Sequence, residues 1–135
     1  MAGCAALALV GAYATGARAG ERRADARVYE LRTYTPAPGK MDGLLARFKN
    51  HTTGLFEKHG IKNVGYWVTT DGKPEEQKLV YIVSHPNREE AAKNWKEFGS
   101  DPDWQAARTE SEKDGKLTAK VESVYLTPTD FSKLK

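Results

Sequence analysis

The hydrophobic and polar positions of this chain follow two different periods. Four segments are rich in β-branched and aromatic residues, and apolar and polar side chains alternate in the first of them, which is typical of β-strands. The third segment is apolar nearly throughout, so we expect it at the centre of a sheet. The predicted strands cover residues 28–34, 64–70, 79–84 and 117–126.

Two other regions repeat apolar side chains every three to four residues, which predicts amphipathic helices. The first covers residues 40–59 and ends at Gly60, because glycine adopts the left-handed conformation of a helix C-terminus without strain. The second begins with Asn87 as its N-cap, and Asp101 caps a further helical piece that has Pro102 at its first position. The order β-α-β-β-α-β predicts an α+β fold of the ferredoxin-like type, an antiparallel sheet with both helices on one face.

Such a sheet has a second face that these helices leave uncovered. Some of the side chains expected there are apolar or aromatic, and their exposure to water would be costly. Two sheets that pack face to face across a two-fold axis would cover each other. We therefore expect a homodimer.

The first 19 residues differ from the rest of the chain. Residues 5–14 are an apolar run rich in Ala, and residues 17–19 place small side chains around a cleavage point, a pattern typical of export signals. The run is shorter than the roughly 20 apolar residues that a membrane-spanning helix needs. We expect an export signal over residues 1–19, a polar lead-in over 20–26, and a periplasmic or secreted domain over 27–135. The alternative is an Ala-rich extension on a cytoplasmic protein.

Composition and motifs narrow the function classes. The chain has 21 basic and 18 acidic residues, and these are mixed along the sequence, so no basic stripe indicates binding to nucleic acid. There is no glycine-rich phosphate loop and no GxSxG, the one cysteine is Cys4 in the predicted leader, and the three histidines lack the HExxH spacing. We therefore expect no metal site and no cofactor, and we disfavour nucleotide-dependent enzymes, serine hydrolases and zinc proteases.

The first predicted strand and the last one carry charged residues. Glu30, Arg32 and Tyr34 share one face of the first strand, and burial of their charges requires partners. Lys120 and Glu122 alternate in the same way on the last strand. We interpret Glu30, Lys120 and Glu122 as interface residues that form ion pairs. Arg32 and Tyr34 can also anchor a small acidic or phenolic ligand.

Two further residues extend this candidate pocket. His51 is the one imidazole in the middle of a predicted helix, where it can act as a general base. Trp67 follows Gly65 on the same strand face, and a small residue beside a large one leaves room for a flat ligand. We expect Arg32, Tyr34, His51 and Trp67 to line a cavity for a small aromatic or carboxylate ligand. If the inward face of the strand is the other one, the four residues divide between two sites.

The chain resembles the NIPSNAP family over residues 27–135. The resemblance is carried by RVYELRTYTPAPGKMDGLLARF (27–48), NWKEFGSDPDWQ (94–105) and the tail TPTDFSKLK (127–135). It implies the dimeric α+β barrel fold and a homodimer, with no established activity for most family members. Two functions stay open: a dimer that binds a small molecule or serves as a scaffold, or an enzyme like the cofactor-independent monooxygenases and isomerases of that fold class.

Overall fold

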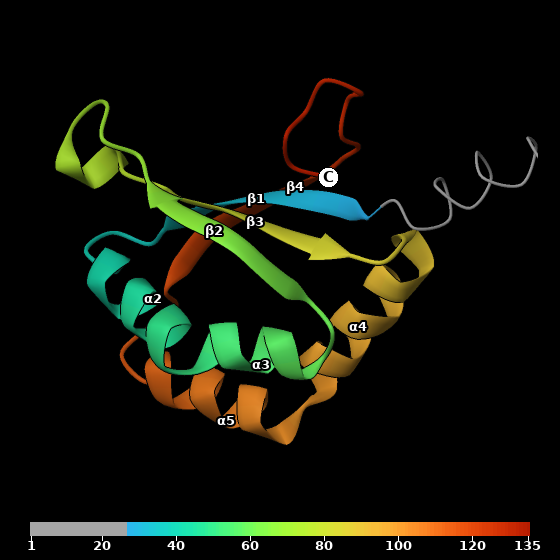
Figure 1. Cartoon of the computed structure of the whole chain (residues 1–135). Helices are drawn as coiled ribbons and strands as arrows, with labels where there is room; N and C mark the ends of the chain where they lie inside the picture. The colour runs from blue at the N-terminus through green and yellow to red at the C-terminus, as the bar shows by residue number, and fades with distance from the viewer. Residues whose placement is uncertain (1–26) are drawn as a thin grey trace, which may run out of the picture.

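One antiparallel sheet runs through the protein, and helices cover one of its faces (Figure 1). A computed structural model describes residues 27–135, so the predicted export signal (1–19) and polar lead-in (20–26) lie outside the described part. The strand order β2-β3-β1-β4, with every neighbouring pair antiparallel, confirms the predicted α+β fold of the ferredoxin-like type. The strands are β1 (Val28–Pro36), β2 (Lys62–Val68), β3 (Leu79–His85) and β4 (Thr118–Leu126).

The first predicted helix consists of three consecutive helical pieces. They are α2 (Met41–Arg47), the π-helical turn η1 (Phe48–Thr52) and α3 (Thr53–Lys58). The Thr53 N–H donates to the carbonyl of Phe48, five residues earlier, so the backbone is locally wider than an α-helix. Gly60 follows the last piece with a φ of +76°, the left-handed conformation that the sequence predicts there.

Two successive helices form the second crossover, and both N-caps are the predicted ones. The Asn87 side chain accepts a hydrogen bond from the Glu90 N–H at 2.8 Å, and Asp101 accepts one from the Asp103 N–H at 2.8 Å. Asp101 also accepts from Lys58 Nζ at 2.7 Å, and this contact holds the pKa of Asp101 well below its usual range. The helices are α4 (Arg88–Ser100) and α5 (Pro102–Ser111), and a short 3₁₀ turn, η2 (Pro74–Glu76), lies between β2 and β3.

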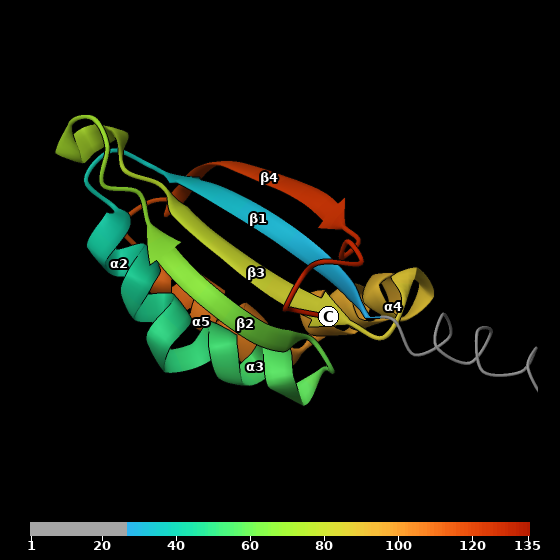
Figure 2. The ribbon, with the colours of Figure 1, turned by 45° about the horizontal axis from the view of Figure 1, so that its top comes forward.

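The strand pairing decides which side chains face the helices. Arg32 lies opposite Tyr81 of β3 and Ser123 of β4, and alternation along β1 places Glu30 and Tyr34 on the same, helix-covered face. The intervening residues point to the other face, which no helix in the described part covers and which we call the open face (Figure 2). Open-face side chains include Tyr29, Leu31, Trp67, Val80, Ile82, Lys120, Glu122, Val124 and Leu126.

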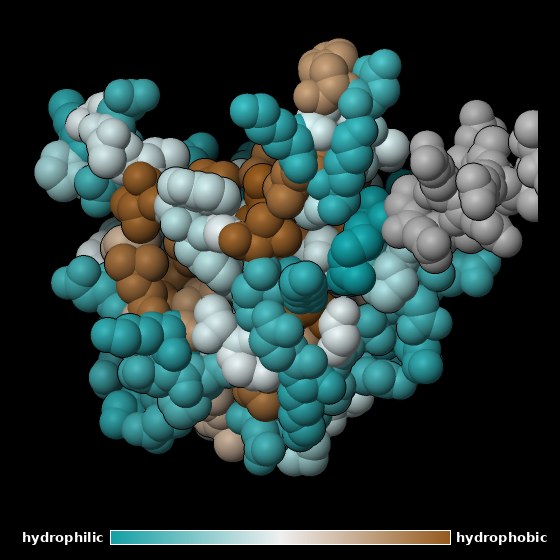
Figure 3. All heavy atoms as spheres, viewed as in Figure 1, coloured by the Kyte–Doolittle hydropathy of each residue, from teal (hydrophilic) through white to brown (hydrophobic). Residues whose placement is uncertain are grey.

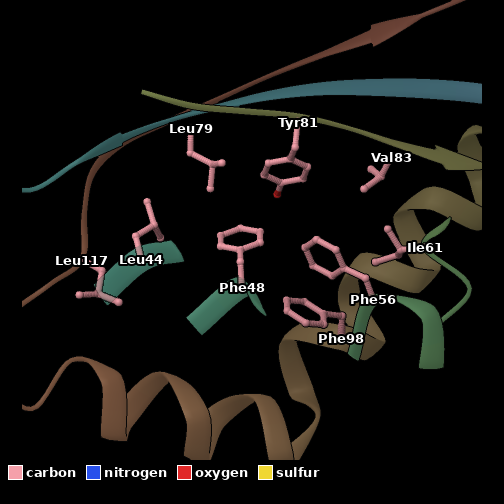
Figure 4. Close-up of a cluster of buried hydrophobic side chains, with 9 residues drawn as sticks. All are labelled: Leu44, Phe48, Phe56, Ile61, Leu79, Tyr81, Val83, Phe98 and Leu117. Atoms are coloured by element: carbon pink, nitrogen blue, oxygen red, sulfur yellow. The ribbon is translucent and has the colours of Figure 1, made fainter. Parts of the chain in front are cut away.

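The core lies between the helices and the covered face of the sheet (Figure 4). Aromatic rings fill much of it. The Tyr81 ring stacks on Tyr66 with centroids 4.9 Å apart, and Phe56 meets Phe98 edge-on at 4.9 Å. No helix within residues 27–135 is both long and apolar enough to cross a membrane.

Candidate functional site

A buried carboxylate, Glu30, organises the polar residues on the covered face of the sheet. Its side chain is 1% exposed, and it accepts four hydrogen bonds. Arg32 Nη1 donates at 2.5 Å, Trp95 Nε1 at 2.8 Å, Ser123 Oγ at 2.8 Å and His85 Nε2 at 3.2 Å. These donors come from β1, α4, β4 and β3, so the carboxylate joins all the layers of the domain at one point.

These four donors keep Glu30 ionised inside the protein. Burial alone raises the pKa of a carboxyl group, because it disfavours the charged form. The hydrogen bonds from His85, Arg32, Trp95 and Ser123 outweigh burial and lower the pKa of Glu30 to about 2. Glu30 therefore stays a carboxylate at any physiological pH, and Arg32 has a fixed counter-charge.

A chain of polar contacts leads from Glu30 along β1 to a second group of side chains. Arg32 Nη2 donates to the Tyr34 hydroxyl at 3.4 Å, and the Tyr81 hydroxyl donates to the same oxygen at 3.1 Å. The Arg32 guanidinium also lies over the Trp95 ring, 4.4 Å from its centroid. Burial tends to lower the pKa of Arg32, but Tyr34, Tyr81 and Glu30 together raise it above its usual value. The Tyr34 hydroxyl oxygen therefore accepts hydrogen bonds from two donors, Arg32 and Tyr81.

Tyr34 forms part of the wall of a cleft between the sheet and the helices. The cleft has a volume of about 210 Å³. Its apolar surface is mostly aromatic and comes from the sheet, η1, α3, α4 and α5: Tyr34, Phe48, Phe56, Phe98, Trp104 and Val121. Its charged residues are Arg47, Arg108, Glu112 and Lys116, three cations against one carboxylate. The cleft thus combines an aromatic surface with a net positive charge.

Arg47 is the buried cation of this cleft. Its side chain is only 5% exposed, and Nη1 contacts Glu112 Oε1 at 3.2 Å and Ser111 Oγ at 3.3 Å. The guanidinium lies 5.1 Å from the centroid of the Trp104 ring. Its Nε is buried and has no hydrogen-bond partner among the described residues. A buried N–H donor without an acceptor is costly, so Arg47 is held in this cleft at a cost in stability.

The structure brings together two of the four residues that the sequence places in one pocket. Arg32 and Tyr34 are in contact on the covered face. His51 is exposed and borders a separate surface hollow between the first helical region and α5. The π-helical turn over Phe48–Thr52 changes the angular spacing of the residues, which turns His51 away from the stripe that faces the sheet.

Trp67 belongs to the opposite side of the sheet. It lies on the open face with 55% of its surface exposed. The space expected beside Gly65 is occupied by the Trp67 ring itself, because a Cβ atom on Gly65 would come within 2.5 Å of that ring. The prediction that Arg32, Tyr34, His51 and Trp67 line one cavity is therefore corrected: they divide between the covered face, the helix surface and the open face.

The predicted interface residues also divide between two faces. Glu30 is buried against α4, where it accepts a hydrogen bond from Trp95, so its assignment to the interface is corrected. Its charge is compatible with burial because four donors of its own chain surround it. Lys120 and Glu122 do lie on the open face, and their Nζ and Oε1 atoms are 3.2 Å apart.

Sequence reasoning missed the cations of the cleft. Arg47 lies six residues after Met41, on the flank of the first helix and outside its apolar stripe. Helical periodicity therefore gave no signal for its burial. Lys116 and Arg108 gave none either, because exposed basic residues are common on any surface. No group of three or more His, Cys, Asp or Glu side chains within residues 27–135 is arranged to hold a metal ion.

Comparison with protein families gives one match that covers most of the chain. The sequence model of the NIPSNAP family matches residues 29–133, from the first strand into the C-terminal tail. No curated protein matches the chain.

Solved structures of NIPSNAP family proteins have a fold similar to that of this chain. A NIPSNAP family protein of unknown function from Agrobacterium tumefaciens is similar with a TM-score of 0.70 and 23% identity, covering 82% of this chain and 96% of that one. A second NIPSNAP family protein from that organism has a TM-score of 0.69 and 26% identity, covering 81% and 99%. A putative antibiotic biosynthesis monooxygenase from Chloroflexus aurantiacus has a TM-score of 0.50 and 19% identity, covering 81% and 99%. At that identity it shows a similar fold alone.

Proposed function

This chain belongs to the NIPSNAP family, and we propose that it is a homodimeric binding protein for a small aromatic carboxylate. The observation that carries the proposal is the cleft beside Tyr34, with its aromatic surface and its buried, partly unpaired Arg47. Arg47 lines this cleft, and its guanidinium is a suitable partner for a carboxylate ligand.

The size of the cleft limits the ligand. An apolar cavity of about 150 Å³ is known to hold one benzene molecule, so 210 Å³ can hold one aromatic ring with a short acidic substituent. Phe48, Phe98 and Trp104 offer ring faces and edges to such a ligand. The three cations favour an anion over a neutral analogue, since one of them, Lys116, has no carboxylate partner among the described residues.

The open face supports the proposal of a dimer. The exposed large hydrophobic side chains include Trp67, Val124 and Leu126 on that face, together with Phe131 and Leu134 of the tail that follows β4. In Figure 3 apolar side chains gather along the upper side of the sheet, beside the tail. An exposed apolar surface of this kind is covered most simply by a second copy in a two-fold arrangement.

The binding proposal is tested with benzoate and 3-phenylpropionate, against benzamide and 3-phenylpropionamide as neutral controls. Trp104 lines the cleft, so binding is followed by tryptophan fluorescence and confirmed by calorimetry. We expect the acids to bind about tenfold more tightly than the amides, because a charge-assisted hydrogen bond is lost with the amide. Equal affinity for acid and amide, or no binding of either acid, contradicts the proposal.

A lysine variant and its control locate the ligand. Lys116→Gln removes a cation of the cleft. Lys116→Gln should reduce the preference for acids over amides, whereas Lys96→Gln, an exposed position on α4 outside the cleft, should leave it unchanged. Equal effects of both lysine variants would place the acid elsewhere on the protein.

An acid–base enzyme of the isomerase type is the second candidate. The Tyr34 hydroxyl accepts from Arg32 and Tyr81, so its own proton is free to be donated to an oxyanion that forms on a ligand in the cleft. Phenylpyruvate is a suitable probe, because its acidic C–H protons exchange through an enol. The measurement is the rate at which these protons exchange for deuterium in D₂O, compared with the rate in buffer alone. Exchange that is faster than in buffer supports an enzyme if Tyr34→Phe loses it but still binds phenylpyruvate. Exchange at the buffer rate supports the binding function only.

Export remains a proposal that rests on the sequence. The apolar run over residues 5–14 and the small residues at 17–19 favour cleavage before the described domain. N-terminal sequencing of the protein from its native host should begin at or near Gly20. Protein that is recovered from the cytosol with Met1 intact contradicts export.

A further inference from the structure

We propose that the C-terminal tail, residues 127–135, is a dimer clasp, in which Phe131 of each chain packs on the open sheet face of the second copy. The proposal rests on the homodimer proposed above and adds a specific anchor to it. It gives a role to Phe131, which lines neither the cleft beside Tyr34 nor the hollow beneath the tail and takes no part in the hydrogen bonds around Glu30.

The tail lies on the side of the sheet where a second copy is expected. It leaves β4 after Leu126 and crosses in front of the open face (Figure 2). Together with Tyr29 and Ile82 of the sheet, it surrounds a hollow of about 290 Å³. The tail is therefore continuous with the apolar surface of the open face.

The tail is held by its own contacts and not by hydrogen bonds to the sheet. Within the described residues, the Ser132 N–H donates to the Thr129 carbonyl at 3.2 Å, and Lys135 Nζ donates to the Asp130 carbonyl at 2.6 Å. No hydrogen bond joins residues 127–135 to the rest of the described chain. These contacts fold the tail into a turn that presents its side chains to a neighbour.

Phe131 is the most exposed large hydrophobic side chain of the described residues. It is 85% exposed, and it does not line the hollow beneath its own tail. Leu134 of the same tail is 51% exposed. A dimer that covered only the strands would leave both side chains in water, so burial of the apolar surface is complete only if the tail takes part.

The family comparison supports the tail as part of the domain. The match to the NIPSNAP family continues to residue 133 and so includes Phe131 and Ser132. An unrelated appendage would lie beyond the matched residues. A second copy is therefore the occupant that the tail and the open face both fit, because each copy supplies one tail and one open face.

The contact is tested directly by NMR on a dimer in which one copy of the full chain is ¹³C-labelled and the other is not. We expect intermolecular NOEs from the Phe131 ring protons of one copy to open-face methyl groups of the other, such as those of Ile82 and Val124. NOEs from Phe131 only to its own chain, or to no open-face side chain, overturn the clasp.

Sedimentation equilibrium separates the clasp from the dimer itself. Phe131→Ser should raise the dimer dissociation constant by about 100-fold, since two apolar anchors are lost. Phe131→Leu keeps an apolar side chain and should weaken the dimer less than Phe131→Ser, whereas the neighbouring Lys133→Ser should stay within about threefold of the natural chain. A natural chain that sediments as a monomer refutes the homodimer and the clasp together. A natural dimer that Phe131→Ser does not weaken refutes the clasp alone.

Discussion

The two faces of the sheet differ in which side chains they carry and in how those side chains are covered. The helix-covered face carries the charges Glu30, which is buried, and Arg32, which is half-buried, and both have partners from their own chain. The open face carries Trp67 and Val124, apolar side chains that are more than half exposed. The helices of the same chain thus cover one face, whereas the other face leaves large apolar side chains exposed within the described residues.

We expect substitutions on the covered face to change the stability of one chain, and substitutions on the open face to change the association of two chains. Glu30 joins β1, β3, β4 and α4 through four hydrogen bonds, so changes on the covered face should act on folding. Open-face residues such as Val124 contribute little to the fold of one chain, so changes there should act on association. Substitutions on one face, each with a control at a matched position, distinguish the two effects.

The largest effect is expected for a charge on the open face. Val124→Lys would bury two unpaired ammonium groups in a two-fold interface, which should raise the dimer dissociation constant by at least about 100-fold in sedimentation velocity. Val121→Lys is the matched control, because Val121 lies on the same strand with 45% exposure but points to the covered side. Equal dissociation by both variants, or by neither, contradicts the assignment of the open face.

The next effect concerns stability and its dependence on pH. Glu30 has a pKa of about 2 in the folded protein, below its ordinary value near 4.5. A depressed carboxyl pKa stabilises the fold fully above the unfolded pKa, and the gain is lost as the pH falls through 4.5 towards 2. Glu30→Gln should therefore reduce the free energy of unfolding by roughly 3 kcal/mol at pH 7, and by less in acid.

Urea denaturation at several pH values measures this prediction. The control is Glu97→Gln, the same substitution at an exposed position of α4, which should change stability by no more than about 0.5 kcal/mol at any pH. If Glu30→Gln lowers stability equally at pH 7 and pH 3, the loss comes from packing and not from the ionised carboxylate.

The third effect tests the shape of the open face at Trp67. A Cβ atom on Gly65 would lie 2.5 Å from the Trp67 ring, and this exposed ring can move aside. Gly65→Ala should thus change the folding free energy by less than about 1 kcal/mol, but weaken the dimer about tenfold by displacing an aromatic contact. The control Gly54→Ala adds its Cβ to open space in a helix. A dimer unchanged by Gly65→Ala would remove Trp67 from the interface.

Local rules in the sequence predicted most of the fold. The caps at Asn87 and Asp101 and the left-handed Gly60 depend on a few neighbouring residues, and the structure confirms all three. The grouping of Glu30 with Arg32 follows from alternation along one strand, which is equally local. The strand order then follows from the sequence of elements.

The candidate site was harder to predict because it depends on contacts between distant elements. Alternation separates the two faces of β1 but does not say which one the helices cover, so Glu30 was assigned to the interface. The π-helical turn that displaces His51 has no simple sequence signal. Arg47 meets Glu112 and Trp104 only after α5 docks on α2, so the cleft could not be assembled from periodicity.

The smallest effect is expected for Lys120 and Glu122, the ion pair on the open face. Both side chains are well exposed, at 66% and 48%, and an exposed pair contributes about 0–1 kcal/mol. If two-fold symmetry brings each pair near its copy, Lys120→Gln should weaken the dimer about threefold at 0.1 M salt and have no effect at 1 M, where the screening length falls from about 10 Å to 3 Å. Lys93→Gln, an exposed position on α4, should change neither value. A loss that persists at 1 M salt would mean that association buries the pair, since solvent ions screen only exposed charges.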